Sequence, residues 1–358
     1  MTKTTTLLAK KEVSVEANRT AEQSLPLSIS VPYLLFIGDA AEAKTARGLL
    51  HWCPDHCLGQ LRLGEMPTDL GLPDMSLDEA ISAGAKTLII GVTPIGGQIP
   101  AHWVPVFSRA LEKGLDIANG MHARLADFPD LCQLAENHGR EIHDVRHPDQ
   151  QFTIPDFSFR PGKRLLTVGT DCAVGKMFTA LAIEREFKSR GLNADFRATG
   201  QTGILIAGSG VSVDAVPADF ISSAAAWLSP ANAPEHWDII EGQGSLFHPA
   251  YAGVTLGLVH GSQPDVMVLC TDPSRETMMY FDGYPQPSLT DCIDAYIWAA
   301  RRTNPKAHVA GISINTAGMK QQEALRLIDK TQQECNLICF DPLRTGVGGL
   351  VDILQQEK

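Results

Sequence analysis

The feature that most constrains the fold is a strand, a glycine-rich loop and a helix that follow one another over residues 164–190. The apolar run 165–168 predicts a buried strand, and the loop 169–176 has the form G-x5-G-K. Apolar side chains then recur at helical spacing, at Ala180, Ile183 and Phe187, and Gly191 is placed to end the helix. The chain must therefore contain a strand-loop-helix unit of the α/β class.

The chemistry of this loop favours an anionic ligand. Glycines allow successive backbone N–H groups to point at one place, the helix N-terminus adds partial positive charge, and Lys176 adds a full charge. The sequence therefore predicts a phosphate-binding loop, although a glycine-rich turn without a ligand is the alternative. The residues expected to contact the ligand are Gly169, Thr170, Asp171, Cys172, Ala173, Val174, Gly175, Lys176, Met177 and Phe178.

The loop resembles that of dethiobiotin synthetase and related P-loop proteins, whose pattern is G-T-D-x-x-V-G-K-T. It differs from the common P-loop in having five residues between the glycines and in carrying Met177 where a Ser or Thr is usual. That hydroxyl normally holds Mg²⁺ against a nucleoside triphosphate, and a thioether cannot replace it. The loop is therefore expected to bind phosphate without supporting metal-assisted phosphoryl transfer.

Composition describes an ordinary globular chain that is long enough for two domains. Of its 358 residues 44% are hydrophobic and 20% charged, and the net charge of −11 argues against binding to nucleic acid or to an anionic membrane. Neither a membrane-spanning apolar run nor a signal-peptide core is present. Eight scattered cysteines are typical of reduced thiols, so a cytoplasmic location is expected.

Three segments are predicted. Residues 1–30 are a polar N-terminal arm, residues 31–154 a Rossmann-like domain, and residues 155–358 a P-loop NTPase-like domain. The proline-containing segment 147–162 is the linker. Each domain is expected to be a mainly parallel sheet covered by helices, because short apolar runs alternate with helical patterns. The first domain lacks G-x-G-x-x-G after its first strand, which leaves dinucleotide binding unsupported.

The expected elements follow from the apolar patterns. Strands are predicted at 33–37, 86–92, 115–118, 141–145, 165–168, 194–200, 237–240, 265–270, 308–314 and 337–340. Helices are predicted at 40–50, 77–83, 103–113, 127–138, 289–301, 321–335 and 349–358. The long, glycine-containing segment 245–263 is expected to be an ordered, functional loop.

Several polar residues follow predicted strands, where open parallel sheets bind their ligands. Glu241 ends the strand in WDIIEGQG, at the position of a Walker-B acid, and is the first candidate for a general base; His248 is the second. The segment RATGQTG offers Arg197, Gln201 and Thr202 for a carboxylate or phosphate. Further substrate-binding candidates are Arg344, in the last loop, and His122. The alternative interpretation of His122 is an exposed loop histidine without a role in the site.

Four motifs together resemble a two-domain bacterial and archaeal family that was long described as a domain of unknown function. They are GTDCAVGKM, RATGQTG, EGQGSLFHPAY and DPLRTGVGG. The resemblance extends from about residue 33 onward and includes the D-glutamate N-acetyltransferases of D-amino-acid catabolism. It implies transfer of acetyl from acetyl-CoA to the α-amine of D-glutamate.

Acetyl-CoA suits the sequence because it requires a phosphate socket and a base pocket but no metal. The loop and Lys176 would bind its phosphates, and in the resembling P-loop group an Asn at the position of Asn315 contacts the base. Glu241 or His248 would remove the amine proton, and Arg197 and Arg344 would bind a dicarboxylate. Cys172 lies near a helix N-terminus, where its pKa is expected to fall, so an acyl-thioester route is a minor alternative.

Other readings remain open. The alternatives are an ATP-dependent ligase or kinase resembling dethiobiotin synthetase, and a nucleotide- or CoA-binding regulator without catalysis. A nicotinamide-dependent epimerase is a weaker reading. The segment HWCPDHC at 51–57 fits no common zinc pattern, and no metal site is expected. The resembling group also implies a homodimer or a larger homo-oligomer. Two parallel-sheet domains with a cleft between them further predict that the acceptor binds at the domain junction.

Overall fold

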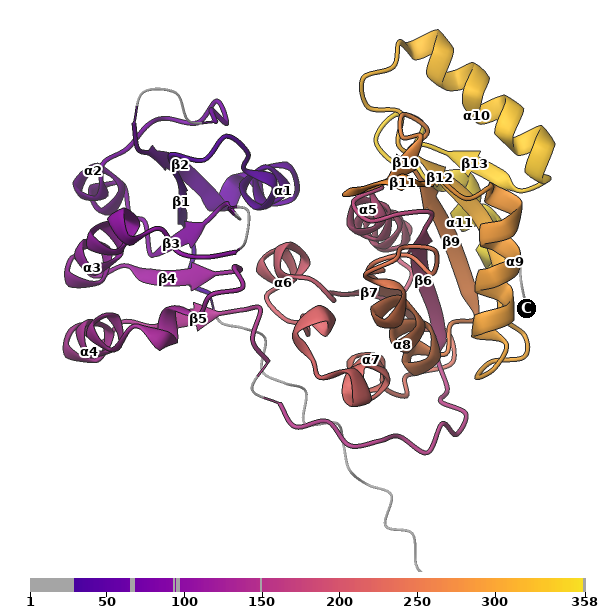
Figure 1. The fold of residues 1–358 in the computed structure, drawn as a ribbon, viewed down its shortest axis with the longest axis horizontal. Coiled ribbons are helices and arrows are strands. Elements are labelled where there is room, and N and C mark those ends of the chain that lie inside the picture. The colour runs from indigo at the N-terminus through magenta and orange to yellow at the C-terminus, as the bar shows by residue number, and fades with distance from the viewer. Residues whose placement is uncertain (1–28, 65–67, 93, 95–96, 149, 357–358) are drawn as a thin grey trace, which may run out of the picture.

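The computed structural model describes residues 29–64, 68–92, 94, 97–148 and 150–356 (Figure 1). The predicted N-terminal arm therefore lies outside the described residues, except for its last two positions. Two α/β units follow one another along the chain, as the sequence predicts, and residues 151–160 between them have no regular secondary structure. Among the described residues no helix is both long and apolar enough to cross a membrane.

The first unit is a five-stranded parallel sheet in the order β2-β1-β3-β4-β5. Its strands are β1 (Tyr33–Gly38), β2 (Cys57–Arg62), β3 (Thr87–Ile90), β4 (Asp116–Asn119) and β5 (Ile142–Asp144). Its helices are α1 (Lys44–Trp52), α2 (Leu77–Ser82), α3 (Val104–Glu112) and α4 (Pro129–His138). The continuous apolar runs in β1 and β3 are fully buried, as expected for strands covered on both faces.

Strand β2 is not expected from the sequence. Its centre carries Gly59 and Gln60, which interrupt any apolar pattern. Gln60 is nevertheless buried, because its side chain hydrogen-bonds Asp69, the carbonyl of Leu72 and the backbone N–H of Leu70. A loop that follows the strand thus satisfies the buried amide, and no local signal reveals this.

The second unit is a six-stranded parallel sheet in the order β13-β12-β9-β6-β8-β7. Its strands are β6 (Lys163–Gly169), β7 (Ala194–Arg197), β8 (Trp237–Ile240), β9 (Val266–Thr271), β12 (His308–Ile314) and β13 (Ile338–Phe340). Its helices are α5 (Lys176–Ser189), α6 (Gln201–Ala207), α7 (Ile221–Leu228), α8 (Ala252–Ser262), α9 (Leu289–Ala300), α10 (Gln321–Cys335) and α11 (Gly348–Gln356). A short antiparallel hairpin joins β10 (Thr277–Met278) to β11 (Phe281–Pro285). Apolar clusters on both faces of the sheet confirm the predicted α/β class.

Helix α8 corrects the prediction of a loop over 245–263. Its glycines permit close packing against α7 instead of breaking the helix. A Cβ atom on Gly261 would lie 2.1 Å from the carbonyl oxygen of Ser222, and one on Gly257 would lie 2.7 Å from Cγ2 of Ile221. Close helix contact of this kind needs small residues on one face of the helix. In the sequence alone, the same glycines are typical of a loop.

The two units are packed together through α6 and α1, and Figure 1 shows α6 between the two sheets. The hydroxyl groups of Thr45 on α1 and Thr202 on α6 are 3.1 Å apart. Ile204 and Leu205 of α6 belong to the apolar cluster of the first unit. The domain junction is therefore a packed interface and brings the loops of both sheets near one another.

We expect Gly261→Ala to destabilise the protein by about 1–3 kcal/mol, because the added methyl group would overlap the backbone of α7. Thermal or urea unfolding monitored by circular dichroism measures the change. Gly253→Ala in the same helix is the matched control, since a Cβ there meets no atom within 4 Å. That variant should be unchanged or up to about 1 kcal/mol more stable. Equal effects of the two changes would contradict this account of α8.

Candidate active site

The candidate site is built on the carboxyl edge of the second sheet, where parallel strands all end together. The phosphate loop follows β6, Glu241 follows β8, and Asn315 follows β12. Strand β8 is the direct neighbour of β6 on one side, and β9 separates β6 from β12 on the other. With about 4.8 Å between neighbouring strands, the three features span roughly 15 Å of this edge.

The phosphate loop has the backbone geometry that its glycines predict. Gly175 has a φ of 100° and directly precedes α5, while Ala173 adopts a φ of 52°. Lys176 is buried, and its Nζ donates a hydrogen bond of 2.7 Å to the carbonyl oxygen of Asp171 within the loop. Burial lowers the pKa of Lys176. The loop is thus folded around its own lysine, which needs only a side-chain rotation to meet an incoming anion.

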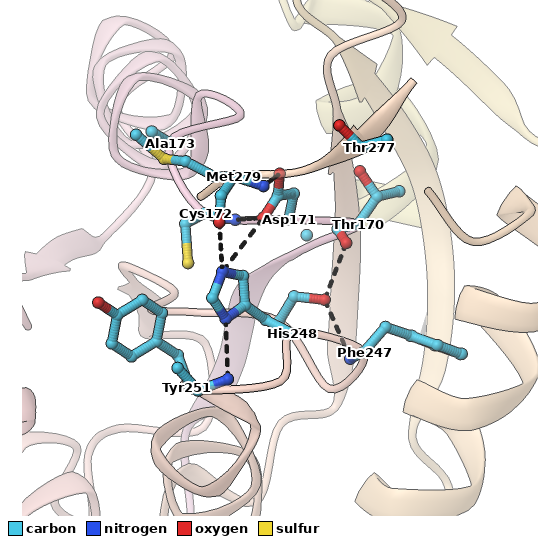
Figure 2. Close-up of polar contacts among 12 residues, drawn as sticks. Thr170, Asp171, Cys172, Ala173, Phe247, His248, Tyr251, Thr277 and Met279 are labelled. Atoms are coloured by element: carbon cyan, nitrogen blue, oxygen red, sulfur yellow. Dashed lines mark hydrogen bonds and ion pairs between the residues drawn. The ribbon is translucent and has the colours of Figure 1, made fainter. Parts of the chain in front are cut away.

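Asp171 anchors the loop to the β10–β11 hairpin (Figure 2). One of its carboxylate oxygens accepts hydrogen bonds from the backbone N–H of Met279 at 2.8 Å, from Gln286 at 3.0 Å and from Arg275 at 3.0 Å. Burial opposes ionisation, but these donors and the N–H of Cys172 hold the pKa of Asp171 below its usual value. The Asp171 carboxylate is therefore occupied by hydrogen bonds from the protein itself.

Arg275 fixes the tip of the same loop. Besides Asp171, its guanidinium binds the carbonyl oxygens of Cys172 at 2.7 Å and Ala173 at 3.0 Å. No sequence pattern marks this residue, because its partners lie more than one hundred positions earlier in the chain. The two carbonyl groups that it holds would otherwise be free to turn toward the ligand side of the loop.

Glu241 is held beside the loop by a close backbone contact. A Cβ atom on Gly242 would lie only 1.7 Å from the carbonyl oxygen of Thr167, so glycine alone allows β8 to end against β6 here. The Glu241 side chain is buried, and its Oε2 accepts hydrogen bonds from the backbone N–H groups of Thr199 at 2.9 Å and Gly200 at 3.1 Å. Among the described residues no hydrogen bond is donated to Oε1.

Burial raises the pKa of Glu241 to about 7, even though the two backbone N–H groups and the charge of Lys176 act in the opposite direction. A carboxyl group with such a pKa changes protonation state near neutral pH. It can therefore accept a proton and release it again, which is the property required of a general base.

His248 is fully buried below the loop, with both ring nitrogens engaged (Figure 2). Its Nδ1 accepts a hydrogen bond from the backbone N–H of Ala250 at 3.2 Å, so Nε2 carries the proton and donates to the carbonyl oxygen of Met279 at 3.1 Å. The ring stacks on Tyr251 at a centroid distance of 4.6 Å. Ligand atoms of Asp171, Cys172 and His248 lie within 4.8 Å of one another, but the hydrogen bonds described above occupy Asp171 and His248.

Cys172 corrects one expectation. The sequence predicts a lowered pKa near the helix N-terminus, whereas burial raises the pKa of this thiol and outweighs the nearby charge of Lys176. A thiol that is harder to ionise is a poorer nucleophile, which removes the physical basis for an acyl-thioester at this position.

Met177 and Phe178 turn toward the first domain. A Cβ atom on Gly48 of α1 would lie 3.6 Å from Cε of Met177. The Phe178 ring lies 5.2 Å from His51 and 5.6 Å from Trp52, measured between centroids. The position that holds Mg²⁺ in common P-loops is thus occupied by an apolar side chain packed at the domain junction.

The two arginines predicted to bind substrate lie apart and have protein partners. Arg197 forms an ion pair of 2.8 Å with Asp238. Asp238 lies on β8, three residues before Glu241. Arg344 donates to the Thr316 hydroxyl at 2.9 Å and to the Met319 carbonyl at 3.1 Å. It therefore supports the loop that begins at Asn315. The side chain of Asn315 donates to Asp272 at 3.3 Å, across the ends of β12 and β9.

The remaining candidates meet at the domain junction. Gln201 begins α6 and packs on Gly120 of the first domain, where an added Cβ would lie 3.0 Å from its side chain. Thr202 contacts Thr45, and His122 is exposed in the loop after β4. Three of the predicted residues therefore lie where the carboxyl edge of the first sheet faces α6 (Figure 1).

The fold and the site define a two-domain α/β protein in which a Rossmann-like unit is joined to a P-loop unit. Residues 62–148 match DUF1611_N, described as a Rossmann-like domain of unknown function, and residues 157–351 match DUF1611_C, described as a P-loop domain of unknown function. The chain belongs to the DUF1611 family, which confirms the resemblance drawn from the four motifs.

Curated relatives and a solved structure agree with this assignment. A protein of Tritonibacter scottomollicae named D-glutamate N-acetyltransferase is 50% identical over 91% of this chain and 99% of its own. A protein of the same name from a Pseudoalteromonas species is 45% identical over equal shares. The crystal structure of a DUF1611 family protein from Anabaena variabilis is 31% identical, with a TM-score of 0.82 over 92% of this chain and 100% of that one.

The electrostatic link between Lys176 and Glu241 is directly measurable. We expect the Glu241 carboxyl to titrate near pH 7, and Lys176→Met to raise its pKa further, because removal of a positive charge destabilises the carboxylate. Infrared difference spectroscopy with labelled glutamate would follow the titration. Lys188→Met, an exposed position on the same helix, is the control and should leave the pKa unchanged. A titration near pH 4.5 in the unaltered protein would contradict the described burial.

Proposed function

We propose that this protein transfers an acetyl group from acetyl-CoA to the α-amine of D-glutamate, in the cytoplasm and as a homo-oligomer. The two named relatives support the reaction, because this chain spans 99% of the length of each. All eight cysteines are free thiols, which agrees with a reducing compartment. The observation that carries the proposal is a phosphate loop without its metal-binding hydroxyl, placed directly beside a buried carboxyl group of pKa about 7.

Acetyl-CoA fits the carboxyl edge of the second sheet. Its phosphates would bind the N–H groups of the loop and the ammonium of Lys176, and its adenine would lie two strands away, beside the hydrogen-bonded pair of Asn315 and Asp272. In this assignment Arg344 shapes the base-binding loop, and Arg275 keeps loop carbonyl groups away from the phosphates. Met177 supplies apolar contact at the junction, consistent with a ligand that needs no metal.

Glu241 is assigned as the general base, with Oε1 as the proton acceptor. The substrate ammonium loses one proton to this carboxylate, and the neutral nitrogen then attacks the carbonyl carbon of the thioester. A C–N bond forms, the C–S bond breaks, and the second nitrogen proton passes to the departing sulfur. The products are N-acetyl-D-glutamate, the CoA thiol and one proton that Glu241 releases to solvent.

The other predicted residues receive supporting roles in this scheme. His248 holds the hairpin and the stack with Tyr251, because both of its nitrogens are already hydrogen-bonded. Arg197 neutralises the buried Asp238. Gln201 and His122 are close to the acceptor at the junction.

The reaction is tested by measuring free CoA thiol released from acetyl-CoA with D-glutamate, L-glutamate and D-aspartate as acceptors. We expect turnover with D-glutamate that EDTA does not affect. Absence of turnover with every acceptor, together with magnesium-dependent ATP hydrolysis, would replace this proposal with the ATP-dependent alternative. Tight CoA binding without turnover would indicate a regulator.

Lys176→Ala should weaken CoA binding roughly 10- to 100-fold, the usual effect of losing a hydrogen bond to a charged group. Isothermal titration calorimetry with CoA measures this directly. Lys188→Ala is the control, because that lysine lies exposed at the other end of α5. Unchanged CoA affinity in the Lys176 variant would show that the phosphates bind elsewhere.

The rate should depend on pH through Glu241. Because only the carboxylate form accepts a proton, kcat should fall as the pH drops below about 7. Glu241→Gln should lower kcat by about 10²- to 10⁴-fold and abolish this step in the pH profile. A Gln variant that retains the same step would assign the base to another group.

A further inference from the structure

Arg146 is a buried cation at the domain junction that no sequence motif marks. It follows β5 at the carboxyl edge of the first sheet and is only 6% exposed. Its Nη2 forms an ion pair with Asp214 of the second domain. Its Nε–H is buried and donates to no group among the described residues. A guanidinium in this state has one edge with half of its hydrogen-bonding capacity unused.

An unpaired N–H group inside a protein is unfavourable unless something binds it. Nε and Nη2 form the edge of arginine that binds both oxygens of a carboxylate. Asp214 engages only Nη2, and its own side chain is one-third exposed. One donor of this edge is therefore left without a partner among the described residues, and a carboxylate oxygen is the group that would satisfy it.

Two backbone contacts connect this cation to Glu241. The N–H of Val213, next to Asp214, donates to the carbonyl of Thr199 at 3.0 Å, and the N–H of Thr199 donates to Glu241 at 2.9 Å. Asp214 is also close enough for its charge to raise the pKa of Glu241. Arg146 and Glu241 are therefore linked through one short segment, and among the described residues they make no direct contact with each other.

Two histidines lie near Arg146 at the same end of the first sheet. The pKa of His122 is lowered first by burial and then by the charge of Arg146, with a smaller effect of His147, while Asp214 opposes these. The imidazole of His147 lies 2.9 Å from the carbonyl oxygen of His122. His122, His147, Arg146 and Asp214 therefore form one polar cluster on this side of the junction.

We propose that Arg146 binds the side-chain carboxylate of the acceptor while Glu241 faces its amine, so that Arg146 determines the preference for a dicarboxylic amino acid. This inference rests on the proposed function and assigns a residue to it. Arg197 and Arg344, the cations that the sequence suggests, have other partners.

The test compares D-glutamate with D-glutamine, which has the same shape but no side-chain charge. In Arg146→Gln the KM for D-glutamate should rise roughly 10- to 100-fold, as for loss of a charged hydrogen bond. The KM values for D-glutamine and acetyl-CoA should change little. Arg146→Lys keeps the charge but loses the two-pronged geometry, and should give an intermediate KM.

Asp214→Asn is the matched variant, because it breaks the same ion pair from the other side. If Arg146 binds substrate, this change removes a competing carboxylate, and the KM for D-glutamate should stay equal or fall. If the pair only holds the domains together, both variants should impair both acceptors in the same direction and lower the Tm alike. That second pattern would overturn the inference.

Calorimetry with D-glutamate separates this inference from the proposed reaction. If the unaltered protein binds D-glutamate but releases no CoA, the reaction is wrong, and loss of binding in Arg146→Gln still supports the assigned contact. If the unaltered protein turns over D-glutamate and Arg146→Gln keeps its preference for D-glutamate over D-glutamine, the reaction stands and the assigned contact is wrong.

Discussion

The burial of a lysine and a glutamate at the ends of two neighbouring strands is the constraint on which the site depends. Lys176 and Glu241 are both shielded from water, so each shifts the other's protonation and neither is a simple surface charge. Their proximity requires the backbone of β8 to approach β6 at Gly242, where no side chain fits. The groups proposed to bind phosphate and to accept a proton are thereby brought side by side on one sheet.

The first domain covers one side of the region around Lys176 and Glu241. Met177 and Phe178 pack the start of α5 against α1, so the residue that replaces the metal-binding hydroxyl of a common P-loop faces the first domain. The proposed acceptor site is bounded by α6 and by the carboxyl edge of the first sheet. A donor lying along one edge and an acceptor between two edges would then meet at Glu241.

The phosphate loop is braced from outside. Asp171 and Arg275 connect it to the β10–β11 hairpin, and His248 supports the same hairpin through Met279. Two polar residues of the quoted motifs, Asp171 and His248, are therefore used to hold the loop. Fixed loop geometry suits a ligand that must be positioned, because backbone donors then need no reorganisation when it binds.

Local patterns in the sequence determine the strand-loop-helix unit, the α/β class and most elements, including β12 and α10, because helical and strand periodicity are properties of short segments. They also indicate Glu241, which follows its strand directly. Tertiary structure alone decides that α8 is a helix, and which charged groups are free. Arg146 and Asp214 are 68 positions apart, and Arg275 lies 104 positions from Asp171. Ion pairs and burial depend on such distant partners, so whether an arginine is committed to the protein or left for a ligand is settled only when the chain is folded.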